Sequence, residues 1–590
     1  MSDASSSSAA APWPAMSIAE AHARLTAPGQ RFEMEEKLVH GVKTRVWKNA
    51  PPTLRDVFLN GRAFKDREFV VYEDDRATYE AFARATLKLA HQLIADGVKK
   101  GDRIAVIMRN LPEWPVAFFA GAIIGAIVTP LNGWWTGPEL EYGLTDSGTK
   151  IALMDEERLE RLEGHLANCP ELEKVYACRL AHAHDDPLIH RLEDVIGPVN
   201  GWGELPDLPM PDVDLDTDDD ATILYTSGTT GRPKGALGTH RNMTTNIATS
   251  GIAAVRNFLR RGEAPPEADP HKLPQRVTLL VVPMFHATGC SATLSPAING
   301  GGKLVLMRRF AAEEAMRLIE RERVTATGGV PTIAWQLIEH PARAKYDLSS
   351  LQQVTYGGAP SAPDLVRKIV ETFPASLPGN GWGMTETSAT FTSHLGRDYE
   401  ARPESAGPAA PVGDMQIRDP ADGVTVLPVG AVGELWVKGP QVLRAYWNKP
   451  EATAQTFVDG WLRTGDLARL DEEGFLFIID RAKDMLIRGG ENIYCVEVEN
   501  VLYDHPDVMD AALVGRPHKT LGEEPAAVVH LRPGGTATEA ELRQWVRERL
   551  AAFKVPVQIV FWPETLPRNA NGKILKTELK KVFENPAVEA

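Results

Sequence analysis

The sequence has little cysteine and no excess of positive charge. Its four cysteines among 590 residues are widely spaced and form neither a disulfide framework nor a metal-ligand pattern, so we expect buried thiols in a reducing compartment. A net charge of −15 argues against nucleic-acid binding, which requires a basic surface stripe. Local charge can still oppose the total, so anionic small molecules are not excluded as ligands.

Long hydrophobic runs are scarce as well. The most apolar run, residues 115–131, has prolines near both ends, which favours a buried helix followed by a buried strand over a membrane span. Residues 1–14 are rich in Ser and Ala and lack the basic residues and apolar core of a signal peptide. We therefore expect no transmembrane segment, a disordered tail over residues 1–25, and a cytoplasmic protein.

The chain is too long for one hydrophobic core, so two or more domains are expected. Helical and strand patterns alternate over the first two-thirds, as in the helix predicted for residues 79–96 and the strand predicted for residues 102–108. This alternation predicts an α/β fold with substantially parallel sheets, in which ligands bind at the carboxyl ends of the strands.

The pattern changes twice toward the C-terminus. Short alternating strands with frequent Gly and Pro in residues 413–439 indicate a small β subdomain. Beyond residue 480 the helices and strands fit a compact α+β domain of ordinary size. We therefore predict a large N-terminal domain over residues 26–481, built from α/β subdomains and the β subdomain, and a small α+β domain over residues 484–590.

The most informative segment is Tyr225–Gly235, which combines hydroxyl residues, glycines and Lys234 directly after an apolar run predicted to be a strand. Glycines let backbone N–H groups approach an anion, hydroxyl groups add donors, and the lysine adds positive charge. It is not a Walker A loop, because counting from Gly228 places Pro233 and Gly235 where that motif requires Gly and Ser or Thr. The segment predicts a different phosphate-binding loop, and an ordinary surface turn is the alternative.

Other segments place aromatic, acidic and basic side chains among glycines. Trp382 offers a face for stacking on a base, and Thr385 with Glu386 offers a hydroxyl group and a carboxylate suited to Mg²⁺. Asp466 can accept two hydrogen bonds from ribose, and an ordinary turn aspartate is the alternative. His286 ends a predicted strand, and taken alone it is better explained as a structural histidine. Further blocks of this kind are Tyr356–Pro360, Asp480–Asp484 and Leu566–Lys573.

Taken in order, these blocks resemble the acyl- and aryl-CoA synthetase branch of the adenylate-forming superfamily, which also includes firefly-type luciferases and peptide-synthetase adenylation domains. The resemblance runs from about Thr53 to Lys580. Its most specific motifs are Tyr225–Gly235, Gly381–Thr387, Trp461–Asp466, Asp480–Glu499 and Pro567–Lys573. It implies an acid–CoA ligase that uses ATP, Mg²⁺ and CoA, forms an acyl-AMP, and has a mobile C-terminal domain.

The resemblance also implies a role for individual residues. The ATP phosphates would be held by Thr226, Ser227, Gly228, Thr229, Thr230, Gly231 and Lys234. Adenine would pack against Gly357, Gly358, Ala359, Gly381, Trp382 and Gly383, with Trp382 standing where such proteins usually have Tyr. Thr385, Glu386 and a mobile lysine, Lys573, would be catalytic, with Thr226 and Glu386 at the metal. Asp466 and Arg481 would bind ribose, Lys483 would be the hinge, and Gly489 and Gly490 would flank pantetheine.

The sequence leaves the acid open. The resemblance implies an apolar acyl pocket lined by His286, Val330, Trp335, Tyr356, Gly358 and Met384. We favour a medium- or long-chain fatty acid, and an aryl or arylalkanoic acid is the alternative. A second alternative is an acyl-AMP ligase or a luciferase-like enzyme that does not use CoA, although Gly489–Ile493 favours CoA use. Homodimers are common among such proteins, and the sequence does not require one.

Overall fold

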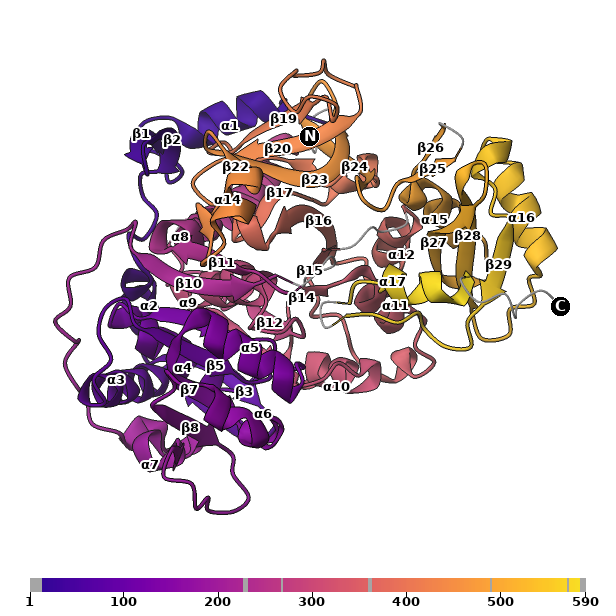
Figure 1. Ribbon diagram of the computed structural model, residues 1–590. Helices are drawn as coiled ribbons and strands as arrows, with labels where there is room; N and C mark the ends of the chain where they lie inside the picture. Colours follow the sequence, from indigo (N-terminus) through magenta and orange to yellow (C-terminus); the bar gives the residue numbers. More distant parts are fainter. Residues whose placement is uncertain are drawn as a thin grey trace, which may run out of the picture.

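The computed structural model describes residues 13–226, 232–266, 269–358, 363–488, 491–569 and 572–583. Figure 1 shows a large body that contains most of the chain, with a small C-terminal domain beside it. Two eight-stranded sheets and one six-stranded sheet build the large body, and a five-stranded sheet forms the C-terminal domain. This is the α/β architecture that the sequence predicts.

The first eight-stranded sheet carries the glycine-rich loop. Its strands lie in the order β21 (Ala445–Tyr446), β11 (Gly235–Thr239), β10 (Asp220–Tyr225), β6 (Ile127–Pro130), β5 (Arg103–Ile107), β7 (Thr149–Asp155), β8 (Lys174–Cys178) and β9 (Ile189–Arg191). β10 runs parallel to β6 and antiparallel to β11, so residues 226–234 connect two neighbouring strands at the carboxyl end of β10. The loop thus lies where an open α/β sheet binds its ligands.

The second eight-stranded sheet brings two glycine-rich blocks together. Its strands lie in the order β17 (Ala389–Leu395), β16 (Leu377–Met384), β15 (Gln353–Gly357), β14 (Ala326–Gly329), β12 (Val277–Leu280), β13 (Lys303–Leu306), β3 (Glu68–Tyr72) and β4 (Asp75–Thr78). The pairs from β16 to β3 are parallel, and β17 and β4 are antiparallel edges. Gly357 pairs with Gly381 across β15 and β16.

Helices cover these sheets and join their strands. They are α2 (Leu54–Arg62), α3 (Tyr79–Ala95), α4 (Glu113–Ile123), α5 (Gly137–Ser147), α6 (Glu156–Leu162), α7 (Glu193–Ile196), α8 (His240–Arg260), α9 (Ser295–Asn299), α10 (Ala312–Glu322), α11 (Pro331–Glu339), α12 (Asp364–Thr372), α13 (Arg397–Ala401) and α14 (Pro450–Thr456). Every residue of α4 is buried, which is typical of a core helix that is apolar on all sides. The predicted helix and strand in residues 115–131 are therefore α4 and β6.

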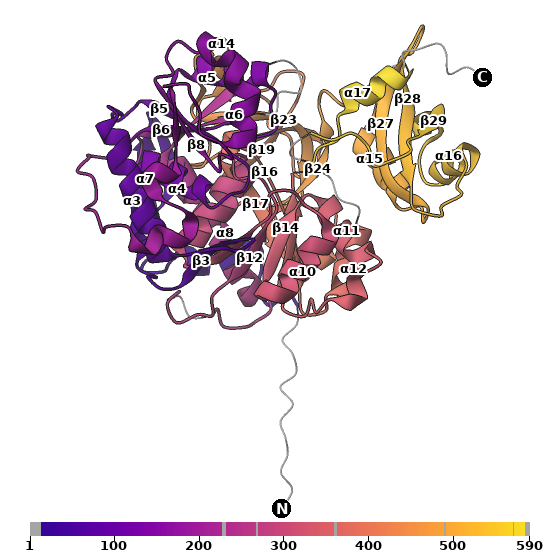
Figure 2. The ribbon, with the colours of Figure 1, turned by 90° about the horizontal axis from the view of Figure 1, so that it is seen from below.

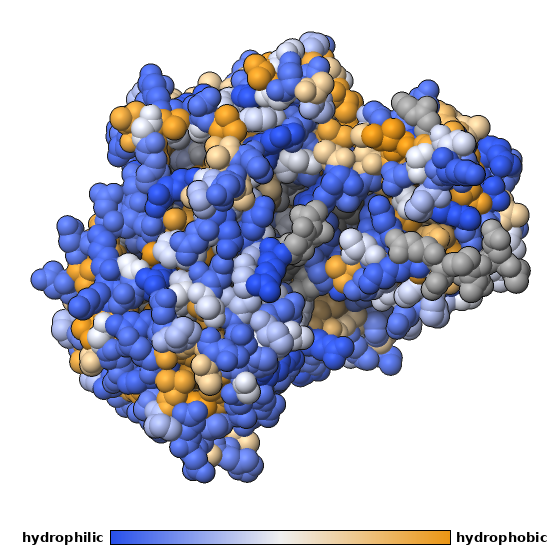
Figure 3. Space-filling model, in the orientation of Figure 1, coloured by the Kyte–Doolittle hydropathy of each residue, from blue (hydrophilic) through white to orange (hydrophobic). Residues whose placement is uncertain are grey.

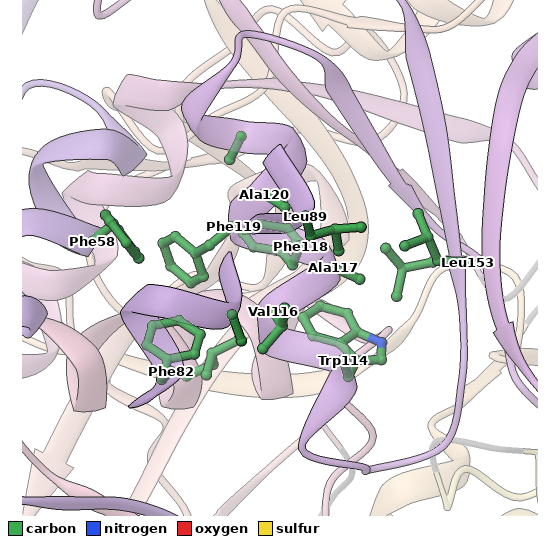
Figure 4. Close-up of a cluster of buried hydrophobic side chains, with 14 of the residues drawn as sticks. Phe58, Phe82, Leu89, Trp114, Val116, Ala117, Phe118, Phe119, Ala120 and Leu153 are labelled. Atoms are coloured by element: carbon green, nitrogen blue, oxygen red, sulfur yellow. The ribbon is translucent and has the colours of Figure 1, made fainter. Parts of the chain in front are cut away.

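The core around α4 is rich in aromatic rings (Figure 4). Phe58, Phe82, Phe118 and Phe119 are at most 1% exposed, and Phe82 meets Phe119 edge to face with ring centroids 6.1 Å apart. Trp114 stacks on Phe118 at 5.3 Å. This cluster fixes the helices that lie behind the first sheet.

The N-terminal tail ends earlier than the sequence analysis predicted. Helix α1 (Ile18–Thr26) begins with a capping box, in which Ser17 and Glu20 bond each other's backbone N–H groups. Its residue Ala21 is fully buried in a cluster that includes Ile252 of α8. Disorder up to residue 25 is therefore wrong for the part of the tail that the structure describes. The hairpin β1 (Met34–Val39) and β2 (Val42–Trp47) follows α1.

The β subdomain precedes the C-terminal domain. Its sheet contains β18 (Gly407–Pro408), β24 (Phe475–Arg481), β23 (Trp461–Leu470), β20 (Gly433–Lys438) and β19 (Asp414–Arg418), with β22 (Phe457–Val458) paired to β23. The C-terminal sheet contains β26 (Glu491–Ile493), β25 (Leu486–Arg488), β28 (Gly522–Leu531), β27 (Val508–His518) and β29 (Gln558–Phe561), with helices α15 (Cys495–Tyr503), α16 (Glu539–Arg547) and α17 (Lys576–Lys580). Figure 2 shows the two parts joined near β24. The chain passes from one sheet to the other over residues 482–485, where Lys483 lies.

Among the described residues, no helix combines the length and the apolarity needed to cross a bilayer. Figure 3 shows that hydrophilic residues dominate one face of the molecule and that hydrophobic residues there form small groups.

Candidate active site

A cavity of about 1240 Å³ lies where the sheets, the β subdomain and the C-terminal domain meet. Its walls include Thr226 after β10, Gly357 at the end of β15 and Glu386 after β16. Arg481 of β24 and Lys573 of the C-terminal domain complete it. Segments more than 300 residues apart in the sequence therefore converge on one cleft, as the motif order predicts.

The base of the glycine-rich loop is closed by two hydrogen bonds. The backbone N–H of Thr226 donates to the carbonyl oxygen of Lys234 at 2.9 Å. The N–H of Lys234 donates to the Thr226 hydroxyl oxygen at 3.2 Å. Both residues line the cavity. Five of the predicted phosphate ligands, Ser227, Gly228, Thr229, Thr230 and Gly231, lie outside the described residues.

Lys234 is connected to Glu386 through Tyr446, a residue that the sequence analysis missed. The Lys234 ammonium lies 4.8 Å from the centre of the Tyr446 ring, and the Tyr446 hydroxyl group donates to Glu386 Oε1 at 2.6 Å. Tyr446 reaches this place because β21 pairs with β11, where Ala236 faces Tyr446. The phosphate-loop lysine and the predicted metal ligand are thus neighbours.

Glu386 is a buried carboxyl group whose surroundings suit a cation. Burial raises its pKa, and the Tyr446 hydroxyl group, Arg481 and Lys234 lower it. Among the described residues, no group of three or more His, Cys, Asp or Glu side chains could form a metal cage. Mg²⁺ commonly binds proteins through one or two carboxylates and completes its shell with water and substrate phosphates, so a single carboxylate beside a phosphate loop fits such an ion.

The predicted ribose pair, Asp466 and Arg481, is formed by adjacent strands. The two residues face each other in the register of β23 and β24, and Arg481 Nε lies 3.3 Å from Asp466 Oδ1. Trp382 lies beside them, because its indole N–H donates to Asp466 Oδ2 at 2.8 Å. Trp382, which is expected to stack on the base, therefore also orients the Asp466 carboxylate. Its ring meets Phe391 edge to face at 6.1 Å.

The glycines of β16 are explained first by the close approach of the neighbouring strand β17. A Cβ atom on Gly383 would lie 1.6 Å from the carbonyl oxygen of Ala389, and one on Gly381 would lie 2.6 Å from that of Thr392. Gly358 has a φ of +75°, which favours glycine. Gly357, Gly358, Gly381, Gly383, Met384 and Thr385 all line the cavity. Ala359 lies outside the described residues.

Lys573 enters the cleft on a loop of the C-terminal domain. Its backbone N–H donates to the side-chain oxygen of Asn569 at 3.0 Å, and its carbonyl oxygen accepts from the Asn569 N–H at 2.8 Å. Burial, together with the charge of Arg481, lowers the pKa of Lys573 to about 8. Lys483 also lines the cavity, and burial and Arg481 lower its pKa. Gly489 and Gly490 lie outside the described residues.

His286 lines the same cavity. Its Nδ1 accepts a hydrogen bond from the backbone N–H of Thr288 at 3.3 Å, and burial lowers its pKa to about 4. The ring is therefore neutral at physiological pH and suits the wall of an apolar pocket.

The cavity lining also extends along β15, where small and apolar residues mix with the polar side chains of Arg276 and Gln353. Val330, Tyr356 and Met384 line its upper part, and the lining continues along β15 to Gln353 and past Ala254 of α8. The predicted acyl-pocket residues His286, Val330, Tyr356, Gly358 and Met384 therefore share one cavity.

Trp335 lies elsewhere, and its prediction as an acyl-pocket residue is wrong. It is not part of the lining of this cavity, and instead borders a hollow of about 30 Å³ between α11 and the C-terminal domain. The guanidinium group of Arg532 lies 5.4 Å from its ring centre. Trp335 thus lies on the side of α11 that faces the C-terminal domain.

The geometry is that of a nucleotide-using enzyme with a cleft between two domains and an extension of that cleft along β15. The chain belongs to the AMP-binding enzyme family, whose profile matches residues 58–447, and the AMP-binding enzyme C-terminal domain matches residues 497–573. This confirms the resemblance to the acyl-CoA synthetases of the adenylate-forming superfamily, which use ATP and CoA.

Individual proteins support the same assignment. A feruloyl-CoA synthase of Amycolatopsis sp. is 36% identical over 507 residues, which cover 86% of this chain and 94% of that protein. A long-chain-fatty-acid–CoA ligase of Bacillus subtilis (strain 168) is 32% identical over 556 residues, covering 89% and 94%. The structure of ATP-bound MatB from Rhodopseudomonas palustris superposes with a TM-score of 0.76 at 30% identity, covering 90% of this chain and 99% of MatB.

Proposed function

We propose that this chain is an ATP-dependent acid–CoA ligase that activates a medium- or long-chain fatty acid. The acid carboxylate attacks the α-phosphorus of ATP, forming an acyl-AMP anhydride and releasing pyrophosphate. The CoA thiol then attacks the acyl carbonyl carbon, forming the thioester and releasing AMP. The second step needs the thiol to lose its proton, and none of the described side chains is assigned to that task.

The first step brings two anions together, so the cleft must offset their repulsion. Lys234 and Lys573 supply positive charge from two domains that meet at the cavity. We assign Asp466 and Arg481 to the ribose and Thr385 to the α-phosphate. Glu386 and Thr226 would hold Mg²⁺, which when bound neutralises phosphate charge. The chain's own contribution is then to position the reactants and to bring the Lys573 ammonium to the phosphates.

The observation that carries the fatty-acid assignment is the depth of the cavity. Its lining follows β15 from Gly357 to Gln353, so it runs beside a five-residue strand, a length of about 16 Å. Small residues form part of the walls of this extension, namely Ser250, Gly251, Ala254, Ala292, Ala297 and Gly328, and Arg276, which donates to the Gln353 side chain at 2.8 Å, lies at its far end. An extended acyl chain of similar length fits this space, with its carboxylate toward Thr385 and its tail beside α8.

An aryl acid is the second candidate. It is supported by the feruloyl-CoA synthase relative, which is 36% identical and therefore closer in sequence than the long-chain-fatty-acid–CoA ligase at 32%. A phenylpropenoid acid would fill only the upper part of the cavity, near His286 and Tyr356. The two candidates thus differ in whether the lower part of the cavity is used.

The test is a panel of acids assayed for AMP release and for thioester formation from free CoA. Fatty acids of increasing length are compared with cinnamic-type acids on the wild type and on Ala254→Trp, which fills the lower cavity. We expect the variant to lose long acids while it keeps short and aromatic ones. Ala421→Trp, at an exposed turn, controls for the added indole.

The outcomes of this panel distinguish the fatty-acid, aryl-acid and CoA-independent alternatives. Preferred turnover of cinnamic-type acids by the wild type would replace the fatty-acid assignment with the aryl one. Pyrophosphate exchange without thioester formation would favour an adenylating enzyme that does not use CoA. No acid-dependent AMP or pyrophosphate release from any acid would contradict the ligase proposal itself.

A further inference from the structure

Helix α11 contacts the C-terminal domain at both of its ends. Val330, directly before the helix, packs against the loop that carries Lys573, because a Cβ atom on Gly572 would lie 2.7 Å from a Val330 methyl group. At the other end, Glu339 forms an ion pair with Arg532, which follows β28. Figure 1 shows α11 on the side of the large body that faces the C-terminal domain. The helix is therefore a docking surface for that domain.

The contact at the second end has two parts. Arg532 Nη1 bonds Glu339 Oε1, and the same guanidinium group lies 5.4 Å from the ring centre of Trp335, one turn earlier on α11. The backbone of Arg532 is held in place, since its N–H donates to the carbonyl oxygen of Asp507 at 2.8 Å. The side chains of Arg532 and Glu339 are 27% and 33% exposed, so the pair is only partly screened by water.

Hydrogen bonds within the C-terminal domain connect this contact region to Gly572, next to Lys573. Asp510 borders the same small hollow as Trp335 and Arg532, and both of its carboxylate oxygens accept from Arg568 Nη2 at 2.7 Å. Arg568 Nη1 in turn donates to the carbonyl oxygen of Gly572 at 2.7 Å. The position of the C-terminal domain on α11 thereby sets the position of Gly572, the residue directly before Lys573.

We propose that Trp335, Glu339 and Arg532 form an interdomain clamp that holds the C-terminal domain in the arrangement that places Lys573 in the cleft. The clamp acts on the first half-reaction by positioning Lys573. It has to open before the C-terminal domain can adopt the second arrangement, in which CoA reacts. This inference rests on the proposed two-step function, and it adds the residues that set the balance between the two steps.

The test separates the two half-reactions. Glu339→Gln and Arg532→Met each remove the ion pair, and we measure kcat/KM for ATP in acid-dependent pyrophosphate exchange and the rate of thioester formation from supplied acyl-AMP. Because an ion pair and a cation–π contact of this exposure each contribute modestly, we expect exchange to fall about threefold to fivefold in Glu339→Gln, which keeps the contact with Trp335, and roughly tenfold in Arg532→Met, which loses both contacts. Thioester formation from acyl-AMP should stay unchanged or rise, which also shows that the variants are folded.

Matched variants make the result specific. Arg532→Lys keeps the positive charge and should restore most of the exchange activity. The double variant Glu339→Arg with Arg532→Glu reverses the pair and should recover activity that either single reversal loses. Arg317→Met removes a comparable ion pair with Glu314 that lies within α10 at 2.5 Å and does not cross the domains, so it should leave both steps unchanged.

Two results would overturn the clamp. One is an exchange rate in Glu339→Gln and Arg532→Met equal to that of the wild type. The other is an equal loss in both half-reactions that the reversed pair does not recover. A wild type that shows no acid-dependent exchange at all would contradict the proposed function instead, so the two failures are distinguishable.

Discussion

Replacement of Tyr446 by Phe tests whether Glu386 serves the nucleotide. The substitution removes the hydroxyl group that donates to Glu386 Oε1 at 2.6 Å and leaves the aromatic ring beside Lys234. Glu386 is 7% exposed, so water replaces the lost donor poorly. The carboxylate then loses the contact that orients it toward the cleft.

The size of the effect follows from this burial. A hydrogen bond to a charged group contributes about 1.5–3 kcal/mol, and an unpartnered buried acceptor carries a similar cost. At about 1.4 kcal/mol per factor of ten, adenylation should fall roughly ten- to hundredfold if the orientation of Glu386 matters for the first step. The loss should be largest at low Mg²⁺ and should shrink as Mg²⁺ is raised.

The assay is pyrophosphate exchange measured over a range of Mg²⁺ concentrations. Tyr176→Phe is the matched control, because the Tyr176 hydroxyl group donates to the Asp96 carboxylate at the same distance, 2.6 Å, far from the cleft on β8. Equal exchange rates in Tyr446→Phe and Tyr176→Phe would refute the role of Glu386 at the phosphates. A loss that does not depend on Mg²⁺ would refute its role at the metal.

Three further predictions concern charge, orientation and packing. Because the pKa of Lys573 is lowered to about 8, its ammonium loses its proton as the pH rises through that value, so kcat/KM for ATP should decline above about pH 8. Lys573→Arg should abolish this decline, and an unchanged profile would contradict the assignment. Trp382→Phe removes the hydrogen bond from the indole N–H to Asp466 and should raise the KM for ATP roughly tenfold. A KM equal to that of the wild type would count against the assignment of Asp466 to the ribose. Phe119→Ala, at a fully buried position, should lower the free energy of unfolding in denaturant titration by about 3–5 kcal/mol, and a change below 1 kcal/mol would show that the core collapses around the gap.

The parts of this protein that were predictable are those where chemistry or burial restricts the residue type. A segment that combines hydroxyl groups, glycines and Lys234 after a strand predicts an anion-binding loop, independently of the rest of the fold. In the structure, residues 226–234 connect β10 to β11. An apolar run with prolines near its ends predicts a core helix, and α4 is buried throughout. Ser17 and Glu20 form a capping box that could have revealed α1, although the Ser- and Ala-rich composition before it suggested disorder.

The missed residues depend on contacts between distant segments. Tyr446 reaches Glu386 only because β21 pairs with β11, more than 200 residues away in sequence, and no local pattern around Tyr446 reports that pairing. Trp335 lies on an apolar helix and was expected to face the acyl pocket. Its actual partner, Arg532, comes from the other domain, and only the docked arrangement of the two domains reveals it.

The charge of the cleft links the clamp to nucleotide binding. Arg481, Lys483 and Lys573 all border the cavity, although the chain as a whole carries −15. Burial, Arg481 and Lys483 oppose the charge on Lys573, Asp466 and Asp484 favour it, and the balance lowers the pKa of Lys573 to about 8. Without a nucleotide, insertion of Lys573 is therefore electrostatically unfavourable, and contacts outside the cleft, such as Glu339 with Arg532, must offset that cost. ATP is a polyanion, so once it is bound the insertion of the Lys573 ammonium becomes electrostatically favourable. The deficit of Glu339→Gln in pyrophosphate exchange should consequently appear mainly in the KM for ATP and shrink at saturating ATP, whereas a loss confined to kcat would refute this coupling.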